Sequence, residues 1–278
     1  MKDRPNSRRN LDAAIERLAD DRAEALRLRR IFANTVVAQM MPAGAVKGGS
    51  AMRIRFGYAA TRFSTDLDTA RAKDIEEFAS DFARSLGEGW NGFTGRLVPL
   101  PAAKPKDVPT GYVMRPFDVK LDYNGKPWLT VKLEVGHNEL GDADEPDHSM
   151  SREISDLFTE LGFPEPDPVP LMQLKFQIAQ KLHGASEPGS ARAHDLVDLQ
   201  IAVSEGDVDW ESTREVCRRL FAYRRMQEWP PTIVENDRWD ELYDAAKEDL
   251  PVLPTVAEAV EWANGLIAKI EGAEGRMG

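Results

Sequence analysis

Cysteine, histidine and long apolar runs are scarce in this sequence of 278 residues. The single cysteine, Cys217, excludes a disulfide within the chain and suits the reducing cytoplasm. No stretch approaches the ~20 apolar residues of a membrane-spanning helix, so we expect a soluble, cytoplasmic protein with no membrane partner. None of the four histidines has a metal-ligand spacing, which argues against a structural zinc site. A Walker-type phosphate loop and a Gly-x-Ser-x-Gly motif are also missing.

Positive charge is in deficit, because 36 Lys and Arg residues face 47 Asp and Glu residues, for a formal net charge of -11. Contacts to phosphate need Lys and Arg, so this balance argues mildly against a surface coated with nucleic acid. A local basic groove is compatible with it, since a partner responds to the local potential rather than to the total charge. The 42% hydrophobic content is that of an ordinary soluble protein, long enough to bury a full core.

The spacing of apolar residues predicts an α+β protein with its strands in the first half. We expect helices over residues 10–41, in two pieces that meet near 20 and 21, and over 50–56 and 74–86. We expect strands over residues 45–47, 66–70, 91–100, 112–123 and 127–137. Asn124-Gly125 predicts an antiparallel hairpin between the last two, and the prolines over 99–109 predict a loop.

The pattern becomes helical from Ser151 onward. Alternating prolines over residues 164–170 predict a hinge, so we place the boundary between two domains there, at 1–163 and 164–278. In the second domain we expect helices over residues 171–183, 191–204, 210–228, 236–246 and 254–271.

The stretch from Lys47 to Asp68 carries the strongest chemical signal. Asp66 and Asp68 point to one face if the backbone is extended, and Leu67 between them then points into the core. Like charges held that close need a divalent cation or a shared proton. The upstream Gly48-Gly49-Ser50 turn offers backbone N–H groups to a triphosphate, so the stretch predicts a nucleotidyltransferase site with Mg²⁺ on the two carboxylates. The alternative is a turn pair or a helix cap.

Glu134 is a candidate third carboxylate. It lies on the polar face of its predicted strand with Lys132, in a hairpin expected beside the Asp66 strand. There it would complete a metal site and orient the attacking hydroxyl. The alternative is an ordinary solvent-facing charge.

Three charged residues of the second half are further candidates. Lys181 lies at the edge of an apolar helical stripe, where it can extend a cation toward a triphosphate or simply reach solvent. Asp195 and Asp198 share a helix face at i and i+3. Helix capping is the alternative for Asp195, and a surface acid or the partner of an arginine is the alternative for Asp198.

The most basic patch lies on one predicted helix and consists of Arg218, Arg219, Arg224 and Arg225. Phe221 and Tyr223 are interleaved with these arginines, as in a surface that grips an RNA backbone and stacks a base. The alternative is a solvated helix face paired to acids.

Taken together, these stretches resemble the AbiEii/AbiGii-type nucleotidyltransferase toxins, within the polymerase-β-like nucleotidyltransferase superfamily. The motifs are KGGSAM at 47–52 with RFSTDLD at 62–68, KLEV at 132–135, IAQKLH at 178–183 and RAHDLVDL at 192–199. The resemblance implies an α+β fold: a mixed β-sheet nucleotidyltransferase domain flanked by helices, then a helical domain that completes the active-site cleft.

By the same resemblance, Lys47 and the Gly48-Gly49-Ser50 turn bind the nucleotide, and Ser64 supports the site. Asp66 and Asp68 hold Mg²⁺ or Mn²⁺, with Glu134 as a further ligand. Lys181 contacts the nucleotide, Asp195 is an essential acid, and Lys132, Glu134 and Asp198 support them.

The function that the resemblance implies is that of a toxin. It would transfer nucleotides from a nucleoside triphosphate to the 3′ acceptor end of tRNA, which blocks translation. A cognate antitoxin would restrain it, as a protein partner or through a kinase-like or DNA-binding activity. Two alternatives stay open: transfer of a nucleotide to a protein hydroxyl, and a non-catalytic module that binds a nucleotide or a partner.

Overall fold

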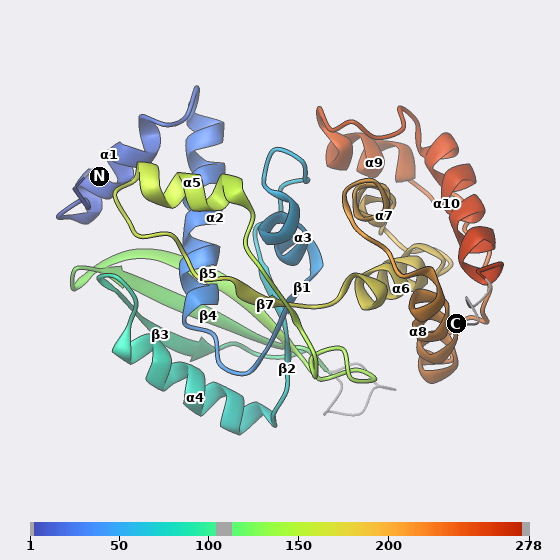
Figure 1. The fold of residues 1–278 in the computed structure, drawn as a ribbon, viewed down its shortest axis with the longest axis horizontal. Helices are drawn as coiled ribbons and strands as arrows, with labels where there is room; N and C mark the ends of the chain where they lie inside the picture. The colour runs from blue at the N-terminus through green and yellow to red at the C-terminus, as the bar shows by residue number, and fades with distance from the viewer. Residues whose placement is uncertain (1–2, 104–112, 274–278) are drawn as a thin grey trace. The chain divides into compact units, whose positions relative to one another are not determined.

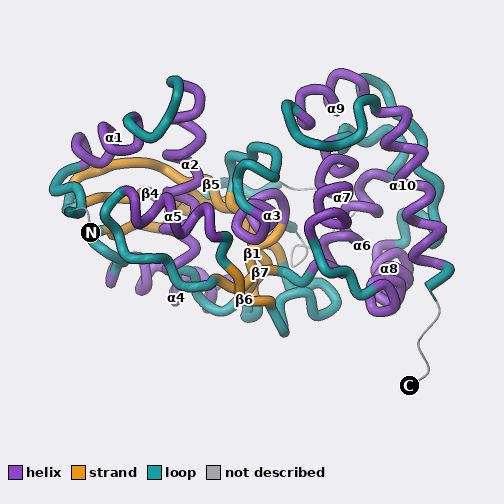
Figure 2. Tube along the Cα trace, turned by 45° about the horizontal axis from the view of Figure 1, so that its top comes forward, coloured by secondary structure: helices purple, strands orange, loops and turns teal. Residues whose placement is uncertain are grey.

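The computed structural model describes residues 3–103 and 113–273 (Figure 1). Contacts along the backbone divide the chain into two compact units. The first unit comprises residues 1–58 and 63–172, and the second comprises 59–62 and 173–278. All strands of the described residues belong to the first unit, and the second contains helices and loops (Figure 2).

The strands and helices follow the predicted order closely. The strands are β1 (Gly44–Lys47), β2 (Leu67–Arg71), β3 (Phe93–Pro99), β4 (Arg115–Tyr123), β5 (Lys126–Gly136), β6 (Asp147–Ser149) and β7 (Val169–Leu171). The helices of the first unit are α1 (Arg8–Glu16), α2 (Arg22–Gln39), α3 (Gly48–Phe56), α4 (Ile75–Glu88) and α5 (Arg152–Glu160). Those of the second unit are α6 (Leu174–Ala185), α7 (His194–Glu205), α8 (Trp210–Arg224), α9 (Trp239–Lys247) and α10 (Val256–Glu271).

One mixed sheet of seven strands, in the order β3-β4-β5-β2-β1-β7-β6, forms the centre of the first unit. The predicted hairpin is confirmed, because β4 and β5 pair antiparallel across a turn in which Asn124 and Gly125 both have positive φ. β2 then pairs parallel with β5 and antiparallel with β1. The predicted α+β class with a mixed sheet is therefore confirmed. The predicted start of a strand at Tyr112 and the end of the 99–109 loop lie outside the described residues.

The proline-rich segment differs from the prediction of a hinge. Its last residues form β7, which pairs parallel with β1 and antiparallel with β6, and neither β6 nor β7 was predicted. Both strands have three residues, too few for an alternation to register. The division between the units comes after Met172 instead of after residue 163, and the segment 59–62 belongs to the second unit.

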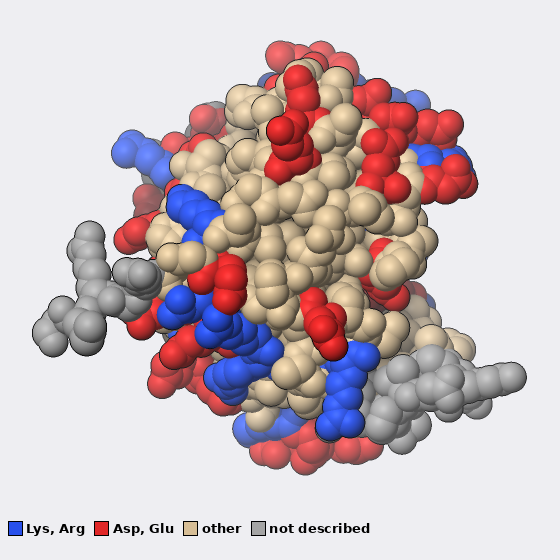
Figure 3. All heavy atoms as spheres, turned by 90° about the vertical axis from the view of Figure 1, so that its right-hand side faces the viewer, with Lys and Arg blue, Asp and Glu red and all other residues tan. Residues whose placement is uncertain are grey.

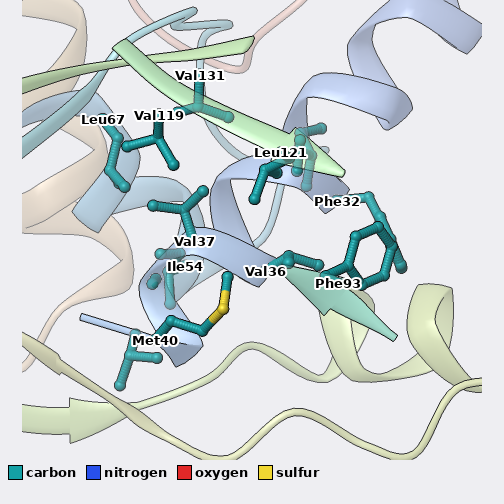
Figure 4. Close-up of a cluster of buried hydrophobic side chains, with 14 of the residues drawn as sticks. Phe32, Val36, Val37, Met40, Ile54, Leu67, Phe93, Val119, Leu121 and Val131 are labelled. Carbon is teal, nitrogen blue, oxygen red and sulfur yellow. The ribbon is translucent and has the colours of Figure 1, made fainter. Parts of the chain in front are cut away.

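The apolar face of the sheet is covered by helices. Phe32, Val36 and Val37 of α2 pack on Leu67 of β2 and on the buried residues of β4 and β5 (Figure 4). Leu67 is fully buried, as its position between two acids predicted. The α2 helix begins at the N-cap Asp21, whose side chain accepts a hydrogen bond from the Glu24 backbone N–H, so the break predicted near 20 and 21 is confirmed.

The opposite face of the sheet is polar. Lys120, Thr130 and Lys132 are exposed on it, since successive side chains of a strand point to opposite faces. The same alternation brings Asp68 and Glu134 to this polar face while Leu67 and Leu133 stay in the core. The position of the acids is therefore fixed by the burial of their apolar neighbours.

Candidate active site

Three candidate residues form a row across three strands of the first unit. Asp68 of β2 is the direct neighbour of Lys47 on β1 and of Glu134 on β5. Directly opposed residues share a face of a sheet, so one cation and two carboxylates lie side by side on the polar face. The prediction that the hairpin lies beside the acid-bearing strand is confirmed.

Gly48 lies directly beside the Asp68 carboxylate. Its φ is +64°, and a Cβ at this position would lie 2.4 Å from Asp68 Oδ2. Glycine is therefore required here both by the left-handed backbone and by the space that the carboxylate fills. Gly48 is also the first residue of α3, and no side chain caps this helix. Its first backbone N–H groups are consequently available to an anion.

Side chains of α3 hydrogen-bond to the backbone of the loop that carries Asp66. Ser50 Oγ donates to the Asp66 carbonyl at 2.7 Å, and Thr65 Oγ1 donates to Asp66 Oδ1 at 3.0 Å. Arg53, which is buried, donates to the Ser64 carbonyl at 3.0 Å. Ser50 and Ser64 thus contribute to the position of the acid pair, Ser64 through its backbone oxygen.

Glu134 is half-buried among charges of its own sign. Burial, and then the charges of Asp68 and Asp66, raise its pKa above the ordinary value, against the opposing charge of Lys47. The Lys47 ammonium lies nearby, because a Cβ on Gly136 would come within 2.7 Å of Lys47 Nζ. Lys132 is exposed on the same face, opposite Asp118 of β4.

The three carboxylates Asp66, Asp68 and Glu134 do not form a ready-made metal cage. Among the residues that the structure describes, no group of three or more His, Cys, Asp or Glu side chains is arranged to hold a metal ion. The set of three ligands predicted from the sequence is therefore not preformed. Asp66 lies in the loop before β2, outside the register that aligns Asp68 with Glu134.

A buried ionic network occupies the second unit. Lys181 of α6 donates to Asp195 Oδ1 at 3.2 Å and to Asp198 Oδ2 at 2.5 Å, and both acids lie on α7. The Lys181 side chain is 6% exposed, and those of Asp195 and Asp198 are 0% and 1% exposed. The solvent-directed lysine and the helix cap considered for Lys181 and Asp195 are therefore wrong, since all three charges are buried together.

Two arginines complete this network, and the sequence patterns did not assign either of them. Arg62 donates from Nε and Nη2 to the two oxygens of Asp198, both at 2.9 Å. Arg192 Nε donates to Asp195 Oδ2 at 2.6 Å. The Arg192–Asp195 pair has i,i+3 spacing on the sequence and could have been found from it. The Arg62 pair spans 136 residues and leaves no local signal, although an arginine was considered as a partner for Asp198.

Charge controls the ionisation of the two acids in this network. Burial alone would raise the pKa of Asp198, but the charges of Lys181 and Arg62 hold it well below its ordinary value. The pKa of Asp195 is likewise lowered, against the effect of burial, by Lys181 and Arg192. Both acids are therefore carboxylates at neutral pH, and three cations surround two anions.

The four arginines near the end of α8 are not equivalent. Arg218 forms an ion pair with Glu271, and Arg224 Nη1 lies 3.4 Å from His183 Nδ1. Arg219 and Arg225 are exposed. A cavity of about 820 Å³ opens beside them, lined by Arg218, Phe221, Arg225, Trp229 and Glu271 among others. Acidic and basic side chains are mixed on the face of the molecule shown in Figure 3, with an uncharged area between them.

The sequence matches the model of a known protein family over a stretch that contains all of these candidate residues. The model described as "Nucleotidyl transferase AbiEii toxin, Type IV TA system" matches residues 30–263, which is most of the chain. The chain belongs to the AbiEii nucleotidyltransferase toxin family. The toxin is therefore a nucleotidyltransferase of a type IV toxin–antitoxin system, and its family implies an antitoxin partner. The family resemblance and the enzyme class predicted from the four motifs are confirmed.

The toxin also resembles solved structures. MenT4, a nucleotidyltransferase toxin of Mycobacterium tuberculosis H37Rv, has a TM-score of 0.58 and 19% identity, over 96% of this chain and 90% of that chain. JHP933 of Helicobacter pylori has a TM-score of 0.42 and 15% identity, over 88% of this chain and 90% of that chain. The likeness to MenT4 shows a shared fold. No curated protein matches the sequence. No helix among the described residues has the length and apolar content needed to cross a bilayer.

Proposed function

We propose that this AbiEii-family toxin transfers a nucleotide from a nucleoside triphosphate to the 3′ end of tRNA, in a reaction that depends on a divalent cation. The observation that carries the proposal is the row of Lys47, Asp68 and Glu134 beside the uncapped start of α3. In this row, carboxylate oxygens lie beside the backbone N–H groups of a helix start that no side chain caps. Oxygen donors suit a hard cation, and helix N-termini suit phosphate.

The acids on the polar face fit a Mg²⁺ or Mn²⁺ ion. Gly48 has no Cβ, so the Asp68 carboxylate lies directly against the helix start where a triphosphate would bind. Mg²⁺ usually takes one or two carboxylates and completes its shell with substrate phosphates and water, so Asp66 and Asp68 suffice without Glu134. When bound, the ion would neutralise phosphate charge and polarise the α-phosphorus.

Glu134 is proposed as the base for the acceptor. The acceptor hydroxyl attacks the α-phosphorus in line, a new P–O bond forms, and the bond to the bridging oxygen breaks to release pyrophosphate. The hydroxyl proton passes to a carboxylate. Glu134 suits this role because its raised pKa brings it closer to neutral pH, where a general base works best.

Lys181 is proposed to contact the triphosphate. An ammonium group has three N–H donors, and two of them are directed to Asp195 and Asp198. The third is left for a phosphate oxygen. The resemblance of residues 178–183 to a motif of the family supports this role for Lys181.

The acceptor is the finer part of the proposal. A cavity at the end of α8 combines two arginines and two aromatic rings with two glutamates, one of which pairs with Arg218. Arg225 and the rings offer the chemistry that unpaired RNA recognises, namely a cation for phosphate and rings for bases. We propose that Arg225, with Arg218, Arg219 and Arg224 nearby, contacts the tRNA. The reaction would take place in the cytoplasm, with the antitoxin as a protein partner or as an enzyme or DNA-binding regulator.

A protein hydroxyl is the second candidate acceptor. Arg53, Arg55 and Arg62 lie close in sequence to the acid pair, but each is engaged within its own unit. Together with the net charge of -11, this leaves fewer cations for an RNA backbone. Membership in the family favours catalysis over the non-catalytic binding module.

A labelling assay tests the proposal. The toxin is incubated with Mg²⁺, total RNA, a cell lysate and each of the four α-³²P-labelled triphosphates in turn. We expect label on a tRNA-sized band that RNase removes, and a decrease of at least about a hundredfold for Asp68→Asn and Asp66→Ala. Asp118→Asn, on the same face of the sheet, is the control and should keep its activity. Label on a protease-sensitive band would support the protein acceptor instead, and full activity of Asp68→Asn would refute the site.

The RNA contact has its own test. Arg225→Glu should raise the KM for tRNA and reduce the slope of log affinity against log salt by about 1, with the KM for the triphosphate unchanged. Arg152→Glu changes the net charge equally at an exposed residue of the first unit and serves as the control. An equal effect of both substitutions would show that Arg225 acts only through the net charge of the toxin and makes no specific contact with tRNA.

A further inference from the structure

A four-residue strap connects the two groups of functional residues along the chain. Residues 59–62 belong to the second unit, while their neighbours Tyr58 and Phe63 belong to the first. The strap brings Arg62 to the buried network, where its side chain is 17% exposed and binds the 1% exposed Asp198. The chain then returns to the first unit and reaches Asp66 and Asp68.

The geometry at Asp198 shows why this arginine matters. Arg62 takes both carboxylate oxygens with a planar two-point fork, which fixes the rotation of the carboxylate as well as its position. Lys181 shares one of these oxygens, Oδ2. A single ammonium could not fix the carboxylate plane, because it acts as a point charge on a flexible stem.

The direction of the free N–H of Lys181 follows from this arrangement. Two of its N–H groups are directed to Asp195 Oδ1 and Asp198 Oδ2, so the positions of these two oxygens set the direction of the third N–H. Without Arg62, Asp198 would be a buried anion with Lys181 as its nearest cation. The Asp198 carboxylate could then rotate, and its Oδ2, which already lies 2.5 Å from Lys181 Nζ, would shift the ammonium with it.

We propose that Arg62 is a positioning residue for nucleotide transfer: it locks Asp198 so that Lys181 presents its third N–H to the triphosphate. This rests on the proposed contact of Lys181 with phosphate. The residue after Arg62 is also held, since Arg27 and Arg53 lie over the Phe63 ring at 5.6 and 5.2 Å. The strap is thus fastened at Arg62 in the second unit and at Phe63 in the first.

The test compares Arg62→Ala, Arg62→Lys and a control, Arg84→Ala. Arg84 pairs with Asp81 on the exposed side of α4, so its substitution removes an arginine–aspartate pair outside the site. We expect Arg62→Ala to remain folded and to lose about a hundredfold in kcat, as a misplacement of about 1 Å at a reacting group can cause. Arg62→Lys keeps the charge but not the fork, so it should lose about tenfold.

Chemical rescue separates positioning from folding. Guanidinium ion, at millimolar concentration and against sodium chloride of equal ionic strength, should restore at least about tenfold of the kcat of Arg62→Ala, because it can occupy the vacated place beside Asp198. Neither the wild type nor Arg84→Ala should respond. A general loss of stability would show no rescue, since guanidinium destabilises folded proteins.

Two results would overturn the proposal. One is a folded Arg62→Ala variant with the kcat of the wild type, and the other is a loss of kcat that guanidinium does not restore. If the wild type labels protein instead of RNA, the RNA acceptor is wrong. The same variants and the same rescue are then measured on the labelled protein, and they decide the role of Arg62 in the same way.

Discussion

Removing the ammonium group of Lys181 should destabilise the toxin measurably. In Lys181→Met the side chain keeps its length, but Asp195 and Asp198 lose the cation that both share. Breaking a buried ion pair from one side costs about 3–5 kcal/mol. Arg62 and Arg192 still hold one acid each, so we expect the lower end, about 3 kcal/mol.

This free energy converts into a shift of the melting temperature. The entropy of unfolding is about 2.1 cal/mol/K per residue, or about 0.6 kcal/mol/K for a chain of this length. A loss of about 3 kcal/mol therefore lowers the Tm by about 5 °C. The sign of the pH dependence follows from the lowered pKa of Asp195 and Asp198. The stabilisation is present above the ordinary aspartate pKa of about 3.9 and is lost as the pH falls through the folded values.

Circular dichroism melts at pH 7 and at about pH 2–3, below the ordinary aspartate pKa, provide the assay. Lys175→Met on the same helix is the matched control, because Lys175 lies over the Phe176 ring and is only partly buried. Its effect should stay within about 0.5 kcal/mol. The reasoning is refuted if Lys181→Met melts at the same temperature as Lys175→Met, since the network would then contribute nothing to stability.

Two further substitutions test the row of charges in the first unit. Glu134→Gln should abolish activity yet raise the Tm at neutral pH. The pKa of Glu134 is raised in the folded protein, so its ionised carboxylate lowers stability once the pH rises through the folded pKa. A lower Tm of Glu134→Gln in melts across the pH range would contradict this. Gly48→Ala should lose activity through the displaced Asp68 and also lose about 1–2 kcal/mol through its left-handed φ. Gly87→Ala, where a Cβ meets nothing within 4 Å, is its control in urea unfolding, and equal effects of both would show that the position of Gly48 is not special.

Much of the first unit follows from local patterns. The alternation around Asn124-Gly125 predicts the β4–β5 hairpin because a strand repeats every two residues and this turn matches its twist. Leu67 predicts that Asp66 and Asp68 avoid the core, for the same reason. The helices of the second unit follow from their apolar spacing. Such signals are local, so they can be read without the fold.

The contacts that create the candidate site are not local. The strand order places Lys47, Asp68 and Glu134 in one row, and no spacing along the chain specifies that order. Arg62 meets Asp198 across a sequence separation of 136, which no local pattern can bridge. The proline-rich segment became β7 because the edge of β1 offered hydrogen bonds to it, although prolines predict a break.

The chemistry of this toxin follows from its sequence, which specifies the acidic residues, the glycine at the start of α3 and the order of the family motifs. The ionisation of those groups and the direction of their side chains depend on the tertiary structure. Burial raised the pKa of Glu134 among like charges, and Lys181 and Arg62 lowered the pKa of Asp198 against the effect of burial. Desolvation and Coulomb forces depend on distance in space, and the fold alone sets that distance.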